Sequence, residues 1–249
     1  LVRRTGMFPI VIAPPIVSSL TSAMLSRGTA ALTRQQVKDS LDRLKARAVI
    51  GGGGNNVVVA IETTRDQLPA VPTLVASELR TPRFDATEFD KLKQEQLAAL
   101  EASKGEPQTL ALIAMQQRMN PYPKGHPMHT LTPEETIAEI GATTVDQVRQ
   151  FHHDFFGASS ADLAVVGDVS ADTITRAARA LFGDWKNPTP FARLVRTAAE
   201  VDSATIAIET PDKANAILAA AQNVALRDDD PYYPALTLAN FILGGGFLN

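Results

Sequence analysis

The chain carries four histidines, the residues most able to hold a transition metal. His126 and His129 flank Pro127 in a proline-rich loop, whereas His152 and His153 are adjacent on a predicted helix. A structural or catalytic zinc site needs three or four protein ligands. Neighbouring helical side chains point about 100° apart, so His152 and His153 cannot easily face one ion. No third ligand is spaced to join His126 and His129, and we interpret all four as polar surface histidines.

Three other clusters contain residue types that occur in catalytic or ligand-binding sites, but a structural role explains each of them better. Ser18, Ser19 and Ser22 would need a base, an orienting acid and a G-x-S-x-G turn to act as nucleophiles. The acidic run 228–230 lacks the spacing and terminal Glu of a calcium loop, so we predict a solvated turn that caps a helix. The four glycines 51–54 precede no Gly-Lys-Ser/Thr, so we predict a flexible turn rather than a phosphate loop.

The composition is that of an ordinary globular protein. The chain has 249 residues, is 45% hydrophobic and 20% charged, and carries a net charge of -3. This length suits one large domain, or one domain with part of another. The mild acidity gives no electrostatic case for nucleic acid. The absence of cysteine excludes disulfides and thiolate metal sites. Prolines interrupt the apolar stretch 7–25, so we expect neither a transmembrane helix nor a signal peptide there.

Helical and strand patterns alternate along the chain and predict an α+β fold. Helices covering one face of a largely antiparallel sheet are expected from this order. The predicted helices cover 14–26, a segment from Thr33 to before the glycine run, 66–80, 85–103, a segment opened by Pro107, one opened by Thr132, 144–156, 170–181 and 230–243. The predicted strands cover 8–13, 56–63, 162–167, 204–209 and 216–221.

The pattern restarts after a proline-punctuated linker at 184–197. We therefore expect a first domain at 1–197 and a truncated second copy of a similar unit at 198–249. The ends also suggest a fragment, because the chain starts at Leu1 and stops after an apolar helix and the glycine turn 244–246. Trp185 is expected to anchor the linker against the sheet rather than to contact a substrate.

Five short motifs follow one another in a recognisable order. They are Met24-Leu25-Ser26-Arg27-Gly28-Thr29; Pro82-Arg83-Phe84-Asp85; Gly125-His126-Pro127 with Leu131-Thr132-Pro133-Glu134-Glu135; Val165-Val166-Gly167-Asp168-Val169 with Leu181-Phe182-Gly183-Asp184-Trp185; and Arg227 to Tyr233 continuing to Leu243-Gly244-Gly245-Gly246. Together they resemble the pitrilysin/insulinase family of zinc metallopeptidases. In active members an H-x-x-E-H motif runs into the Met-x-x-x-Gly-Thr tail.

The resemblance implies a metal motif that has lost its ligands. Ser19 and Ala23 stand at the two histidine positions, and Ser22 stands at the glutamate position. Neither serine nor alanine replaces imidazole, and Ser22 has no carboxylate to act as a general base. The family's distal glutamate ligand corresponds to Glu101 or to Ala102, and one carboxylate cannot hold zinc alone.

The resemblance further implies a layered domain of the LuxS/mitochondrial-processing-peptidase-like type, matching the third domain and the start of the fourth in a tandem-repeat member. Such a segment would bind no metal or cofactor. It would close a peptide-binding chamber beside a catalytic half that carries zinc, in the same chain or in a separate subunit. The family favours a bacterial periplasmic protein, with the cytoplasm left open. The family's substrate-contacting Arg/Tyr pair would lie beyond Asn249.

A second hypothesis comes from a different functional class. Some family members serve as scaffold or assembly domains without any role in proteolysis. A self-sufficient enzyme with an unrecognised site is a third option, for which the sequence offers no constellation of residues. The neighbouring sequence separates the first two, because an intact H-x-x-E-H in the same reading frame or an adjacent gene favours the peptidase.

Overall fold

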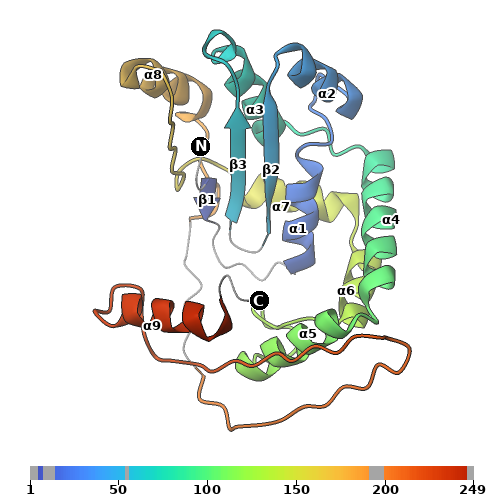
Figure 1. Cartoon of the computed structure of the whole chain (residues 1–249). Helices are drawn as coiled ribbons and strands as arrows, with labels where there is room; N and C mark the ends of the chain where they lie inside the picture. The colour runs from blue at the N-terminus through green and yellow to red at the C-terminus, as the bar shows by residue number, and fades with distance from the viewer. Residues whose placement is uncertain (1–4, 8–14, 54–55, 191–198, 246–249) are drawn as a thin grey trace.

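The computed structural model describes residues 5–7, 15–53, 56–190 and 199–245. In these segments helices surround a small antiparallel sheet, so the mixed α and β character and the antiparallel pairing expected from the sequence are both confirmed. Figure 1 shows the sheet and the helices α1, α2, α3 and α7 in the upper part, with α5 and α9 below.

The sheet has the order β1-β3-β2 and consists of β1 (Thr5–Met7), β2 (Arg47–Gly53) and β3 (Asn56–Glu62). β2 and β3 form a hairpin whose register runs from Arg47 opposite Glu62 to Gly53 opposite Asn56. The glycines 51–53 are therefore strand residues, and the expected flexible turn is wrong for them. Their backbones find partners in β3, which overrides the turn preference of glycine. The strand expected at 8–13 lies outside the described residues.

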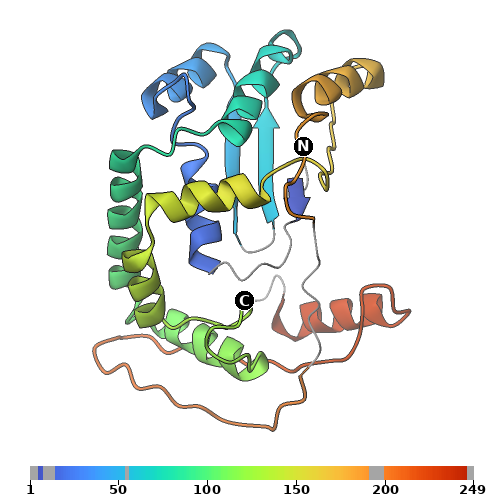
Figure 2. The same cartoon turned by 180° about the vertical axis from the view of Figure 1, so that it is seen from behind.

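One face of the sheet is covered by α1 (Pro15–Met24), which packs on β2 and also contacts α7 (Val145–Phe155). Figure 2 shows α7 crossing this side of the sheet. Leu20 of α1 is 0% exposed and lies in the main core cluster. The other members include Val17, Met24, Leu25, Val57, Val59, Val71, Val75, Leu79, Phe84, Phe89, Leu92, Val148, Phe151 and Phe155.

Most predicted helices are present, with local caps that explain where they begin. Threonines 33, 132 and 144 each form a capping box with the Gln or Glu three residues later. None of the described helices is long and apolar enough to cross a membrane. The remaining elements are α2 (Arg34–Arg43), η1 (Arg65–Gln67), α3 (Ala70–Arg80), α4 (Ala86–Ser103), α5 (Pro107–Met119), α6 (Pro133–Ala142) and α8 (Ala171–Phe182).

The strands expected at 162–167, 204–209 and 216–221 are absent from the described structure, where these segments are irregular. Their apolar side chains are largely exposed, as in Leu218 (95% exposed) and Val166 (83% exposed). A strand is stable only when a neighbour satisfies its backbone and covers its apolar face. The apolar pattern of these segments is typical of strands, but the pattern alone does not show whether a neighbouring strand is present to pair with them.

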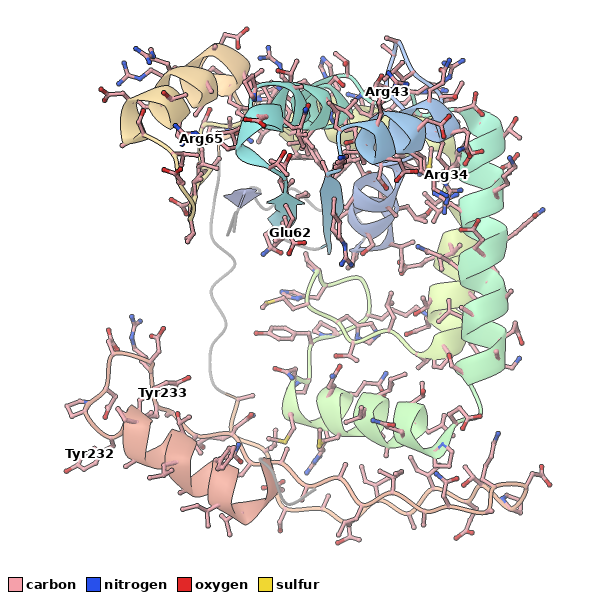
Figure 3. The ribbon with its side chains drawn as sticks, turned by 45° about the horizontal axis from the view of Figure 1, so that its top comes forward. Arg34, Arg43, Glu62, Arg65, Tyr232 and Tyr233 are labelled. Atoms are coloured by element: carbon pink, nitrogen blue, oxygen red, sulfur yellow. The ribbon has the colours of Figure 1, made fainter. Side chains whose placement is uncertain are left out.

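The last part of the chain lies apart from the sheet. Residues 199–232 follow an irregular course along α5 before α9 (Tyr233–Asn240), which continues into a short π-helical turn, Phe241–Gly245. Arg118 of α5 donates to the Asp202 carbonyl at 2.7 Å, and the Asn223 amide donates to the Met119 carbonyl at 2.9 Å. Figure 3 shows Tyr232 and Tyr233 at the start of α9, well away from the sheet.

The interior also contains a carboxylic acid, Glu78 of α3, which is 2% exposed. Its Oε2 atom has no hydrogen-bond partner among the described residues. Burial raises the pKa of the Glu78 carboxyl from its ordinary value of 4.5 to about 7. Transfer of a carboxylate out of water is costly, so the folded chain favours the protonated acid.

Truncating Leu20 should destabilise the fold strongly. We expect Leu20→Ala to lower the free energy of unfolding by about 3 kcal/mol, because a fully buried leucine is replaced by a cavity. Urea denaturation measures the change. Leu218→Ala removes the same atoms from an exposed side chain and should cost less than about 0.5 kcal/mol. Equal losses in the two variants would contradict the assignment of the core.

The folded stability should also fall as pH rises, because of Glu78. Because the pKa of Glu78 is raised on folding, its contribution to the free energy of unfolding is fully present below about pH 4.5 and is lost as pH rises through about 7. We expect Glu78→Gln to be more stable than the wild type at about pH 8, by up to about 3 kcal/mol, and to show little gain at about pH 5. Urea denaturation at both values checks this. Glu101→Gln, at an exposed site on α4, is the control, and an unchanged pH slope in Glu78→Gln would refute the prediction.

Candidate functional site

The three degenerate motif positions lie on one face of α1, because residues 19, 22 and 23 have the i, i+3, i+4 spacing of helical neighbours. Ser22 is 1% exposed, and its hydroxyl donates to the Ser18 carbonyl at 3.1 Å. Ala23 is half-buried and packs against the core cluster. A buried serine bonded to its own helix and a methyl group give this face no strong ligand or base.

Ser19 lies where α1 approaches the glycine strand most closely. A Cβ atom built on Gly53 would lie 2.6 Å from Ser19 Oγ, which is far inside normal contact distance. A larger residue at position 53 would require the Ser19 hydroxyl to rotate away, because the Ser19 Cβ atom lies 3.5 Å away, at an ordinary contact distance. Gly53 thus leaves room for the Ser19 hydroxyl where α1 packs on β2, a role that the sequence did not reveal.

The tail of the motif, residues 24–29, has a structural role in this chain. Met24 is buried in the core, and Gly28 has φ +116°, a conformation that favours glycine. Leu32 donates from its backbone to the Thr29 hydroxyl at 3.0 Å. Arg27, also buried, pairs with Glu95 of α4. These contacts hold the segment between α1 and α2 in place.

No group of three or more histidine, aspartate or glutamate side chains within the described ranges is arranged to hold a metal ion. Glu101, at the candidate distal position, is exposed and pairs with Lys104 on the same helix. Ala102 offers no ligand. The acidic residues 228–230 lie in a turn. There Asp229 pairs with Arg227, and the Asp230 carboxylate accepts a hydrogen bond from the Tyr232 backbone amide at 2.8 Å.

The histidines fall into two separate places. His126 and His129 share the loop between α5 and α6, where His126 stacks on Tyr122 with ring centroids 4.5 Å apart. His153 is exposed and contacts Asp154. His152 differs from the expected surface residue, because its Nε2 atom lies 2.7 Å from the Leu79 carbonyl and burial lowers the pKa of its imidazole. Adjacent aromatic side chains at positions 84 and 156 enclose its ring.

Sequence reasoning missed an apolar pocket of about 1010 Å³ between the sheet and α8. Its walls come from β3, α3, the irregular segment 156–169 and the apolar side of α8. At the rim, Arg65 pairs with Asp168 at 2.6 Å. Figure 3 shows Arg65 and Glu62 near the end of β3. The apolar run at 163–166 was the available signal, but it was assigned to a strand.

The wall formed by α8 is tied to α3 by an ion pair. The Arg80 guanidinium donates to both carboxylate oxygens of Asp184, at 2.8 and 2.9 Å, and this contact lowers the pKa of Asp184. The same guanidinium lies 6.0 Å from the centre of the Trp185 ring. The Trp185 carbonyl accepts from Ala158 at 2.8 Å, so Trp185 does hold the start of the linker against the body of the chain.

Comparison with solved structures supports this description of the fold. A crystal structure of a peptidase M16 inactive domain from Pseudomonas fluorescens aligns over 94% of this chain and 56% of its own, with 24% identity and a TM-score of 0.73. The structure of a protease from Helicobacter pylori aligns over 80% of this chain and 47% of its own, with 17% identity and a TM-score of 0.59. The chain thus spans about half the length of these two proteins.

Two further comparisons concern the sequence itself. A search of curated proteins returns no match. A family model described as the peptidase M16 inactive domain matches residues 142–249, the part that contains α7, the Val165–Val169 motif, α8 and α9. The matched residues do not include Ser19, Ser22 and Ala23. The C-terminal part of the chain thus resembles the peptidase M16 inactive domain in sequence, and the chain shares its fold with a solved structure of such a domain.

Proposed function

We propose that this chain is the non-catalytic portion of a zinc-dependent metallopeptidase. It helps to enclose a peptide substrate beside a zinc-bearing domain or subunit. The observation that carries the proposal is the packing of the degenerate motif, in which Ser22 is buried against its own helix and Ser19 lies against the Gly53 backbone. The helix is integrated into the core through its buried residues Leu20 and Met24.

The same proposal covers the domain arrangement. Residues 1–197 would form one layered peptidase-like domain with its linker, and 198–249 would begin a second similar domain. The exposed apolar side chains of α9 and the turn after it, such as Leu238 and Ile242, are then the surface that the rest of that second domain covers. A periplasmic location in a bacterium is part of this proposal.

The apolar pocket beside β3 is the part of this portion that we assign to the peptide. Its volume of about 1010 Å³ is at the upper end of the range of small-molecule pockets and accommodates several apolar side chains. Among the described residues, no backbone hydrogen bond reaches 162–166 on one wall. An extended peptide can satisfy such a backbone by strand addition and place alternate side chains in the pocket.

Activity should appear only when this chain is combined with its zinc-bearing half. We expect the purified chain to cleave no peptide, because it lacks both the metal ligands and the general base. The complete protein, or a mixture with the zinc-bearing half, should cleave peptides and lose this activity with a chelator. A fluorogenic peptide library provides the assay. Chelator-sensitive cleavage by the chain alone would refute the proposal, and an inactive complete protein would favour the scaffold hypothesis.

A charge placed in the pocket should weaken peptide binding without unfolding the chain. Val166 lines the pocket and is largely exposed, so Val166→Asp should leave the thermal midpoint nearly unchanged. It should raise the Kd of an extended apolar peptide at least several-fold, because the peptide would bury an unpaired carboxylate. Fluorescence anisotropy measures binding. The matched control is Leu218→Asp, at an exposed site on the irregular tail, and equal affinity in both variants would contradict this use of the pocket.

A further inference from the structure

The loop that joins α5 to α6 is held by an unusual arrangement around His129. Its backbone forms successive turns, in which the His126 amide donates to the Pro123 carbonyl at 3.0 Å and the His129 amide donates to the His126 carbonyl at 2.9 Å. On the α5 side, the Gln117 side chain donates to the Thr130 carbonyl at 2.9 Å. The loop is therefore folded back between the two helices, with the His129 side chain at its centre.

Both nitrogens of the His129 ring face acceptors. Nδ1 lies 2.9 Å from the Tyr122 carbonyl oxygen, and Nε2 lies 3.2 Å from Oε2 of Glu135 on α6. A neutral imidazole carries one N–H and can donate only one of these hydrogen bonds. The doubly donating form is the imidazolium, so the observed geometry is complete only when His129 carries a proton.

We propose that this loop is a proton-dependent latch, which His129 closes by bridging the Tyr122 carbonyl to Glu135 and which loosens when the imidazolium loses its proton. The bridge joins the residues after α5 to the first turn of α6. Losing one of its two hydrogen bonds detaches the ring from the Tyr122 carbonyl or from Glu135, while the capping box of α6 remains intact. The proposal concerns a loop remote from the pocket beside β3 and does not depend on peptide binding.

The charges around the ring support the protonated form. Glu135 faces His129 from α6, and Lys124 of the loop contacts the other oxygen of the same carboxylate at 2.8 Å. Glu139, one turn further along α6, acts on Lys124. The hydrogen bonds from Lys124 and from the Thr132 backbone, together with His129, hold the pKa of Glu135 at about 2, so it stays ionised. Lys124 opposes protonation of His129, but the two acceptors outweigh it.

The direction of the pH effect follows from these contacts. The hydrogen bond to the Tyr122 carbonyl raises the pKa of His129 above its ordinary value of 6.5, and the contact with Glu135 acts in the same direction. A histidine with a raised pKa stabilises the closed loop fully below its unfolded pKa. That contribution is lost as pH rises through the raised value. Acid therefore closes the latch, and mild alkali opens it.

Hydrogen exchange and NMR test the latch on the whole chain. We expect the exchange protection of the His129 and Thr132 amides, corrected for intrinsic rates, to fall several-fold between about pH 5.5 and about pH 8.5. Nitrogen-15 spectra of the imidazoles should show His129 as the imidazolium at the lower value. A His129 ring that is neutral at about pH 5.5 would overturn the proposal.

Two variants separate the latch from general loop stability. Glutamine at position 129 cannot carry the positive charge of the imidazolium. The exchange protection of the loop amides in His129→Gln should therefore be low at both pH values. Glu135→Gln keeps the capping box, because glutamine serves at that position as well as glutamate, but it removes the negative charge. It should shift the loss of protection to lower pH. His153→Gln, on the exposed side of α7, is the matched control and should behave as the wild type. Wild-type pH dependence in both His129→Gln and Glu135→Gln would reject the latch.

Discussion

The close contact between α1 and β2 is the constraint on which the rest of the structure depends. Gly53 leaves room for the Ser19 hydroxyl, and the same helix carries Leu20 and Met24 of the core. α7 also packs on α1. Because interiors are close-packed, the helix cannot move away from the strand without opening a cavity. The small residues of the degenerate motif are part of this contact.

This constraint explains why part of the metallopeptidase pattern persists while its chemistry does not. Met24, Gly28 and Thr29 each have a task that needs no metal: core packing, a positive φ and a hydrogen bond that closes the following turn. By the resemblance, Ser19, Ser22 and Ala23 stand where active members have their two histidines and the glutamate. Under the proposed function, the residues that maintain the fold and those that would bind zinc lie on the same helix but differ, so the fold can persist without the ligands.

The sequence predicted the features that local interactions decide. Helices α2, α6 and α7 begin at threonine caps that can be recognised within four residues. The resemblance to the peptidase M16 inactive domain, which the family model matches over residues 142–249, was also recognisable, because the motifs are short and ordered. The features that depend on distant partners were missed. The glycine strand is stabilised by β3, and the segment 162–167 lacks a described partner that would make it a strand. His152 looked exposed on its own helix, but aromatic rings from outside α7 bury it.

The central claim is that this portion of the protein holds no catalytic metal of its own, and its zinc content tests this most directly. Elemental analysis of the purified chain, after dialysis against a trace of free zinc, should give far less than one equivalent. We expect this low zinc content because serine and alanine, which are not zinc ligands, occupy the motif positions on the helix that packs against β2. Zinc near one equivalent, lost on His126→Ala or His129→Ala, would contradict the account, because the chain would then carry a metal site of its own.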